Sequence, residues 1–250
     1  MDKLIFTALS GQASIDQRMQ QIANEVANTS TVGFKKSFES AMQTFRYEGP
    51  GFSSRFVAVP SSGAAVDMSP GTVATTGRSM DVAFSGSQLL AVQAQDGTLA
   101  YTRRGDLKIG GDGSLQIATG EQVQSTGGGA ITPPAQAELK IGTDGTVFVM
   151  PQGDITRTFV PFARMQIVDP PDGTVNLRED GLFKSADGAP FAAAQAPLLS
   201  TGQLEGSNSS VFSALIDMVS MSRRYEMQIK VLKQADELAE RTQGLAKLGG

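Results

Sequence analysis

The sequence predicts an α+β fold, with N- and C-terminal helices forming a coiled-coil-type core and an antiparallel all-β domain in the middle. Two observations support this prediction. Apolar residues at both ends of the chain recur in alternating steps of three and four, which is the spacing of a coiled-coil seam. Between Gly33 and Gly206 no stretch keeps a helical period for three turns, and Asp-Gly pairs separate short apolar runs. Helices are therefore expected only at the two ends.

The first expected element is an N-terminal assembly helix within residues 1–30. The polar cluster Asn28–Thr31 favours a helix end, and Gly33 can turn the backbone where a side chain would hinder it. Asn28 and Gly33 are therefore expected to form the helix exit. The seam of this helix has one polar position, Gln12, and its apolar residues are Ile5, Ala8, Ile15, Met19, Ile22 and Val26.

Residues 31–70 are expected to form an extended connector that is rich in aromatic residues and begins near Phe34. Stretches containing Gly and Pro at 49–51 and 60–63 interrupt it. Such stretches favour turns, so a long helix is not expected in this part of the chain.

Residues 71–203 are expected to form a β-rich outer domain. Asp-Gly between apolar runs is a strong hairpin signal, because glycine accepts a positive φ without steric cost. Six such pairs at irregular spacing predict a small sandwich or barrel, since a solenoid would keep a fixed period. The clearest apolar runs are Leu89–Gln93, Leu115–Ile117, Val147–Met150 and Ala163–Val168.

A C-terminal assembly helix is expected within residues 204–250. The polar segment Gly206–Ser210 offers a cap before an apolar stripe. The stripe shifts after Leu232, which indicates a stutter that locally unwinds a supercoil. Before the shift, the apolar seam residues are Val211, Leu215, Met218, Tyr225, Ile229 and Leu232.

Composition excludes several classes of function. The chain of 250 residues has neither Cys nor His, so thiolate chemistry is absent and the commonest general base and metal ligand are missing. Its net charge of -4 argues against a nucleic-acid partner, because phosphate binding needs a basic surface. No apolar run approaches the roughly 18 residues of a membrane span. We therefore expect no enzyme activity, no cofactor or metal, no nucleic-acid partner and no direct membrane insertion.

Three separated stretches carry a resemblance to a known family. Residues 22–35, IANEVANTSTVGFK, resemble the signature of bacterial flagellar rod and hook proteins. Residues 204–208, LEGSN, and the helix that follows are similar to the C-terminal motif of that family. Residues 81–84, DVAF, and 101–105, YTRRG, resemble two of its internal elements. These motifs follow one another in the family's order, on the expected helix, sheet and helix.

The resemblance implies a structural subunit of the flagellar basal-body rod, which polymerises through its terminal helices into a helical drive shaft that transmits torque. The opening residues 1–5 and the segments 128–134 and 179–183 favour a proximal rod subunit. The implied partners are other copies of the chain, neighbouring rod proteins and the flagellar export apparatus. The implied location is the rod within the periplasmic space. Both seams, with Asn28, Gly33 and Phe34, are the expected subunit contacts.

Three alternatives stay open at this stage. A distal rod subunit is the nearest relative within the family. The two seams also fit an antiparallel helical hairpin in a monomer. A secreted β-domain that binds polysaccharide, or a glycosidase, is a third alternative, since a pair of carboxylates suffices for glycoside hydrolysis. The candidate carboxylates for such a pair are Asp67, Asp81, Asp96, Asp106 and Asp112.

Overall fold

The computed structural model of the protein describes residues 2–39, 43–49, 52–59, 64–151 and 157–248. The chain separates into two compact units. Unit 1 consists of Met1–Ala27, Glu39–Ser62 and Ser210–Gly250, and unit 2 consists of Asn28–Phe38 and Gly63–Ser209. Each unit is therefore assembled from segments that lie far apart in the sequence.

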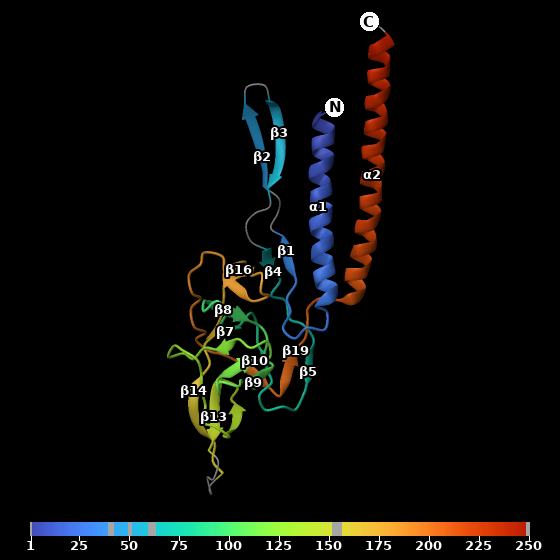
Figure 1. Ribbon diagram of the computed structural model, residues 1–250. Helices are drawn as coiled ribbons and strands as arrows, with labels where there is room; N and C mark the ends of the chain where they lie inside the picture. The colour runs from blue at the N-terminus through green and yellow to red at the C-terminus, as the bar shows by residue number, and fades with distance from the viewer. Residues whose placement is uncertain (1, 40–42, 50–51, 60–63, 152–156, 249–250) are drawn as a thin grey trace. The chain divides into compact units, whose positions relative to one another are not determined.

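Unit 2 is built on a sheet of ten strands within the described residues. Neighbouring strands follow the order β1, β4, β16, β17, β8, β7, β11, β10 and β9, and β15 also pairs with β7. Figure 1 shows the central strands β7 and β8 beside each other. The strands of this sheet are β1 Ser37–Glu39, β4 Ala64–Val66, β7 Leu89–Gln93, β8 Leu99–Thr102, β9 Leu107–Ile109, β10 Leu115–Ile117, β11 Gln122–Val123, β15 Ile167–Val168, β16 Val175–Leu177 and β17 Phe183–Ser185.

Smaller sheets complete unit 2. A three-stranded sheet contains β12 Glu138–Ile141, β13 Thr146–Met150 and β14 Val160–Arg164. The last segment of the unit pairs back to its beginning twice: β18 Leu199–Thr201 with β6 Val82–Phe84, and β19 Gln203–Glu205 with β5 Val73–Thr75. The last two strands of unit 2 therefore pair with strands that lie more than a hundred residues earlier in the sequence.

Strand β7 separates the two apolar clusters that stabilise unit 2. Successive side chains of a strand point to opposite faces of its sheet. Leu90 and Val92 accordingly belong to the larger cluster, whereas Leu89 and Ala91 belong to the smaller one. All four side chains are buried. A continuous apolar run is what a strand covered on both faces requires.

The predicted antiparallel β middle is confirmed, and its turns form where Asp-Gly pairs occur. The expected runs at Leu89–Gln93 and Leu115–Ile117 are strands with those bounds. The glycine of every Asp-Gly pair has a positive φ: Gly97, Gly113, Gly145, Gly173, Gly181 and Gly188. These turns reverse the chain because glycine has no Cβ to oppose that conformation.

The apolar run Ala163–Val168 contains residues of two strands, β14 and β15. The chain changes sheets within it: Ala163 in β14 pairs with Val147 of the three-stranded sheet, whereas Ile167 in β15 pairs with Leu90 of the large sheet. Between them, Met165 is buried in the larger apolar cluster. An apolar run alone cannot reveal that its two halves pair with different partners.

Unit 1 contains helix α1 Asp2–Ala27, helix α2 Val211–Leu248 and a hairpin of β2 Gln43–Gly49 with β3 Phe52–Val59. The two helices run alongside each other (Figure 1). They approach closely at Gly11, where an added Cβ would lie 2.5 Å from Nε2 of Gln228. Neither helix, over its described residues, is long and apolar enough to cross a membrane.

The predicted fold class was wrong. The described chain is mostly β, and its terminal helices do not form a coiled-coil-type core. Among the described side chains of α2 only Ala214 is buried, while large apolar residues such as Phe212 and Ile216 are exposed. Apart from Ile22 and Ala214, the buried apolar residues of the described chain lie in unit 2. Regular apolar spacing predicts which residues can share a helix face, but burial also needs a partner surface that covers that face.

Replacement of Leu90 by alanine should lower the free energy of unfolding of unit 2 by about 2–5 kcal/mol, because a cavity would open in the larger apolar cluster. Urea-induced unfolding followed by circular dichroism would measure this loss. The control is Leu99→Ala on the adjacent β8, where the side chain is 39% exposed and the loss should stay under about 1 kcal/mol. Equal losses would contradict the assignment of the core.

Candidate functional site

A buried carboxylate joins four separate segments of unit 2. Glu205, at the end of β19, accepts a hydrogen bond from Lys35 Nζ at 2.6 Å through Oε1 and from Arg103 Nε at 2.6 Å through Oε2. Its Oε1 also accepts the backbone N–H of Gly71 at 2.8 Å. Lys35, Arg103 and Glu205 are all buried. We refer to these three residues as the ionic clamp.

Backbone carbonyls complete the surroundings of the two cations. Lys35 Nζ donates to the carbonyl oxygen of Ser69 at 2.6 Å. Arg103 donates from Nη2 to the carbonyl oxygen of Phe84 at 2.7 Å and from Nη1 to that of Gln88. The clamp contains two positive charges and one negative charge, so these carbonyl dipoles compensate the excess. A buried charge is tolerated only when it is paired and hydrogen-bonded in this way.

The surroundings favour the charged form of Glu205. Burial acts to raise the pKa of its carboxyl, but the charge of Arg103, the hydrogen bond from Lys35 and the N–H of Gly71 outweigh burial and lower that pKa below its usual value. Burial lowers the pKa of the Lys35 ammonium, and Glu205 opposes that shift. Glu205 is therefore an anion in the folded protein, where it lies between two cations.

Asn208 ties the same segments together a second time. Its Oδ1 accepts the backbone N–H of Lys36 at 2.8 Å, and its Nδ2 donates to the carbonyl oxygen of Asp67 at 2.9 Å. Its backbone N–H donates to the carbonyl oxygen of Phe34 at 3.3 Å. The segment that follows α1 and the segment that precedes α2 are thus bound to each other inside unit 2.

Gly33 allows the first of these segments to approach the backbone beside Arg103. It has a φ of 67°, and a Cβ at this position would lie 2.5 Å from the carbonyl carbon of Arg103 and 2.7 Å from the nitrogen of Arg104. The N–H of Gly33 donates to the backbone oxygen of Glu205 at 2.8 Å. Glycine is therefore required here for two reasons, its conformation and the space available.

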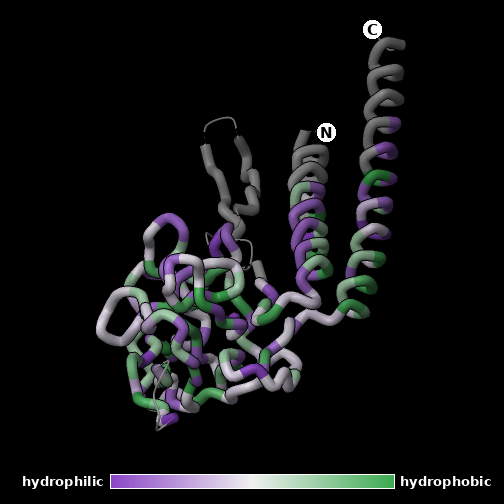
Figure 2. The backbone as a smooth tube through the Cα atoms, turned by 60° about the horizontal axis from the view of Figure 1, so that its bottom comes forward, coloured by the Kyte–Doolittle hydropathy of each residue, from purple (hydrophilic) through white to green (hydrophobic). Residues whose placement is uncertain are grey.

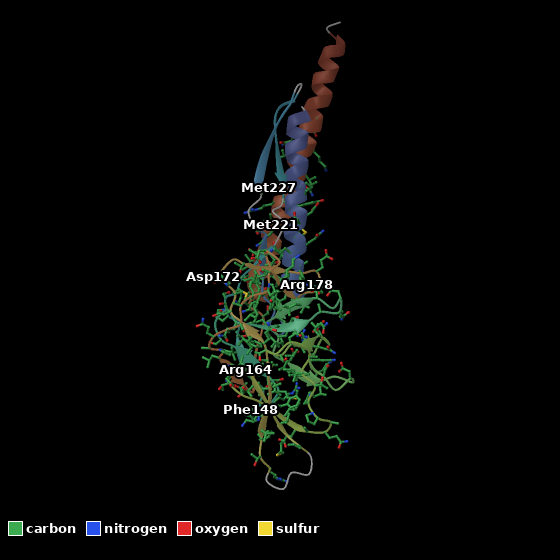
Figure 3. All side chains as sticks on the ribbon, turned by 90° about the vertical axis from the view of Figure 1, so that its left-hand side faces the viewer. Phe148, Arg164, Asp172, Arg178, Met221 and Met227 are labelled. Atoms are coloured by element: carbon green, nitrogen blue, oxygen red, sulfur yellow. The ribbon has the colours of Figure 1, made fainter. Side chains whose placement is uncertain are left out.

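Helix α2 presents an apolar surface that the sequence reading did not single out. Phe212 is 81% exposed and Ile216 is 69% exposed. Val219 and Met227 are exposed on the same side, because their spacing of three, four and eight residues returns to one helix face. We refer to Phe212, Ile216, Val219 and Met227 as the outer face of α2. The hydrophobic start of this helix is visible in Figure 2, and Met227 is labelled in Figure 3.

Comparison with known proteins identifies the family. The chain is 35% identical over 243 residues to the flagellar basal-body rod protein FlgF of Salmonella typhimurium, and the match covers 95% of each chain. It is 32% identical to FlgF of Escherichia coli over 99% of this chain and 100% of the relative. The chain belongs to the flagellar basal-body rod protein family. It is also 28% identical to the rod protein FlgG of Bacillus subtilis, over 96% of this chain and 97% of that one.

Two family models match separate parts of this rod protein. The model described as the flagellar hook protein FlgE/F/G D1 domain matches residues 83–149, and the model of the flagellar basal body rod FlgEFG protein C-terminal matches residues 200–245. Arg103 lies in the first match and Glu205 in the second. The ionic clamp therefore connects the two matched regions. The predicted recognition as a rod protein, most like FlgF, is confirmed.

The family is one of structural proteins, so this rod protein is a structural subunit of the flagellar basal body and not an enzyme. The described carboxyls whose pKa is clearly shifted all have a lowered pKa; hydrogen bonds from Thr98, with Arg178, lower the pKa of Asp96 to about 2. Arg178 is labelled in Figure 3.

The predicted contact residues near the end of α1 fall into two groups. Gly33 and Phe34 lie beside the ionic clamp, as their backbone hydrogen bonds to Glu205 and Asn208 demonstrate. Asn28 forms a local turn, in which its carbonyl oxygen accepts the N–H of Thr31 and its Oδ1 accepts the Thr31 hydroxyl. In α1, Ile22 is buried, Ile15, Met19 and Val26 are half-buried, and the side chains of Ile5 and Ala8 lie outside the described residues.

The predicted contact residues of α2 are not gathered in a common core. Val211, Leu215 and Tyr225 are exposed, and Met218 and Ile229 are half-buried. The side chain of Leu232 lies outside the described residues. The structure therefore places these residues on the helix without showing what they touch in an assembly.

Sequence reasoning missed Lys35, Arg103, Glu205 and Asn208 as functional residues. All four lie within the stretches that carried the family resemblance, which was the one available signal. Charged side chains are usually solvated, so nothing in the local pattern indicated that these would be buried together. Among the described residues, no cluster of acidic side chains could hold a metal ion.

Replacement of Gly33 by alanine should destabilise unit 2 more than replacement of Gly77 does. Both glycines have similar φ values, 67° and 74°, so each variant carries a similar conformational strain of about 1–2 kcal/mol. A Cβ at Gly77 meets nothing within 4 Å, whereas at Gly33 it meets backbone. Gly33→Ala should therefore lose about 1–3 kcal/mol more in urea-induced unfolding. Equal losses would show that the close approach is unimportant.

A fall in pH should lower the free energy of unfolding of unit 2, in part through protonation of the Glu205 carboxyl. Because folding lowers the pKa of this carboxyl, its contribution to stability is present above the ordinary value of 4.5 and is lost as the pH falls through the lower folded value. Unfolding free energies measured from about pH 7 to about pH 3 should fall less steeply below pH 4.5 in the triple variant Lys35→Met, Arg103→Met, Glu205→Met than in the original chain. Identical pH profiles would contradict this assignment.

Proposed function

We propose that this rod subunit joins its neighbours through its terminal helices and polymerises into a helical drive shaft that transmits torque. The observation that carries the proposal is the exposed outer face of α2. A contiguous exposed apolar surface favours association with another protein. Contacts between different surfaces of successive subunits generate a helical assembly when the rotation does not close.

The predicted seam residues that are exposed or half-buried, with Asn28 and Phe34, are the further proposed subunit contacts, whereas Ile22 and Gly33 are already buried within the chain. Partly exposed residues such as Leu215 and Tyr225 are available for such contacts. The partners would be other copies of this chain and neighbouring rod proteins. The ionic clamp and Asn208 support this function, because they bind the segment that follows α1 to the segment that precedes α2. Force on either helix would then pass into a cross-linked part of unit 2.

The proposal extends to the place of the subunit in the flagellum and to its delivery there. The relatives named FlgF support a place in the proximal rod. That place would lie within the periplasmic space, and the flagellar export apparatus would deliver the chain there.

Replacement of Ile216 by aspartate should reduce incorporation into rods by about tenfold or more, because an unpaired charge would be buried in the proposed contact. The measurement is the amount of the variant in basal bodies purified from cells that contain no other copy of the protein. Swimming should be lost in parallel. The amount exported and the unfolding of unit 2 should both remain unchanged.

The matched control is Ser213→Asp, which adds the same charge to an exposed polar position of the same helix, at the edge of the outer face. A negative charge in the first turn of a helix is also favourable. This variant should incorporate normally. Normal incorporation of Ile216→Asp would rule out the outer face as a subunit contact.

A further inference from the structure

The contacts of the ionic clamp join residues that are distant in the sequence. Glu205 lies 102 residues from Arg103, 134 from Gly71 and 170 from Lys35. Asn208 lies 172 residues from Lys36. The chain between such residues loses more conformational entropy when they meet than it does in a short loop. Contacts of this kind therefore form late when local contacts are available.

The core of unit 2 has many local contacts. β7 pairs with β8, β9 with β10, β12 with β13 and β16 with β17, each across a short turn. These hairpins contribute many of the residues in the larger and smaller apolar clusters. Most of the buried apolar surface can thus assemble before residues 203–208 are in place.

Charge adds a second reason for late closure. Lys35 and Arg103 each direct a donor at Glu205 from opposite ends of its carboxylate. Without Glu205, two cations would be buried near each other with no anion between them, and such an arrangement is strongly unfavourable. Outside the clamp, the carboxylate of Asp67 lies 4.0 Å from Lys36 Nζ, and its charge acts only weakly on Lys35 compared with that of Glu205. Packing of residues 33–36 and 69–71 beside Arg103 is therefore favourable only with Glu205 in place.

We propose that Glu205 is a closing latch, which engages after the β core of unit 2 has formed and makes completion of the unit depend on its last segment. The segment that follows α1 and the segment that precedes α2 are joined only at this final step. A chain whose C-terminal part is not yet available keeps these segments apart.

Pulsed hydrogen–deuterium exchange during refolding of the full chain tests the order of events. The clamp is reported by the amides of Gly33 and Gly71, which donate to Glu205. The core is reported by the amides of β7 and β8. The core amides should gain protection about tenfold faster or more. Simultaneous protection, or earlier protection of Gly33 and Gly71, would overturn the proposal.

The variant Glu205→Gln tests the latch at equilibrium. Exchange at Gly33 and Gly71 should accelerate about 100-fold or more, since two buried cations lose their anion, while exchange in β7 and β8 should change little. An equal acceleration throughout unit 2, or none at Gly33 and Gly71, would contradict a latch that closes on a preformed core. The control Glu179→Gln removes an exposed carboxylate and should alter neither group.

The triple variant Lys35→Met, Arg103→Met, Glu205→Met isolates the effect of charge. Apolar residues of similar size can replace a buried ion network without loss of folding. In this variant the delay between protection of the core and of Gly33 and Gly71 should shorten, because no like charges oppose closure. An unchanged delay would refute the electrostatic part of the latch.

Discussion

The structure of unit 2 depends on the placement of one buried carboxylate between two buried cations. Glu205 has to receive Lys35, Arg103 and the N–H of Gly71 at the same time, because each buried charge is tolerable only while the others are in place. This requirement fixes four segments of the chain against one another. Gly33 and Asn208 then hold the same segments through the backbone, so the ionic contacts do not act alone.

The two units are stabilised in different ways. Unit 2 buries its apolar residues in two clusters on either side of β7 and pairs the buried charges of the ionic clamp internally. The described part of α2 instead leaves its large apolar residues exposed. A subunit of a polymer needs both properties, since its body has to be stable alone while its contact surfaces become buried only against neighbours. Two residues of the ionic clamp, Lys35 and Glu205, lie close in sequence to the end of α1 and the start of α2.

Much of unit 2 could be predicted because its signals are local. An Asp-Gly pair at residues 96–97 reverses the chain whatever lies elsewhere, and the apolar run Leu89–Gln93 forms a strand with those bounds. The strand pairing of Ala163–Val168 could not be predicted for the opposite reason, because the partner of each half lies in a different sheet. The predicted helical core failed because the spacing of apolar residues does not reveal whether any surface covers them. The outer face of α2 was not predicted, because it lies beside a second apolar stripe that begins at Val211 and both stripes have helical spacing.

The local turns, strands of the central β region, the helical ends of the chain and, through short motifs, the family can all be inferred from the amino-acid sequence. The meeting of Lys35, Arg103 and Glu205 is visible only in the folded structure. Turn and strand preferences depend on neighbouring residues, so they can be read along the chain. The meeting of three charges across up to 170 residues depends on the path of the whole β unit and on burial that excludes water. No pattern within the separate motifs contains that information.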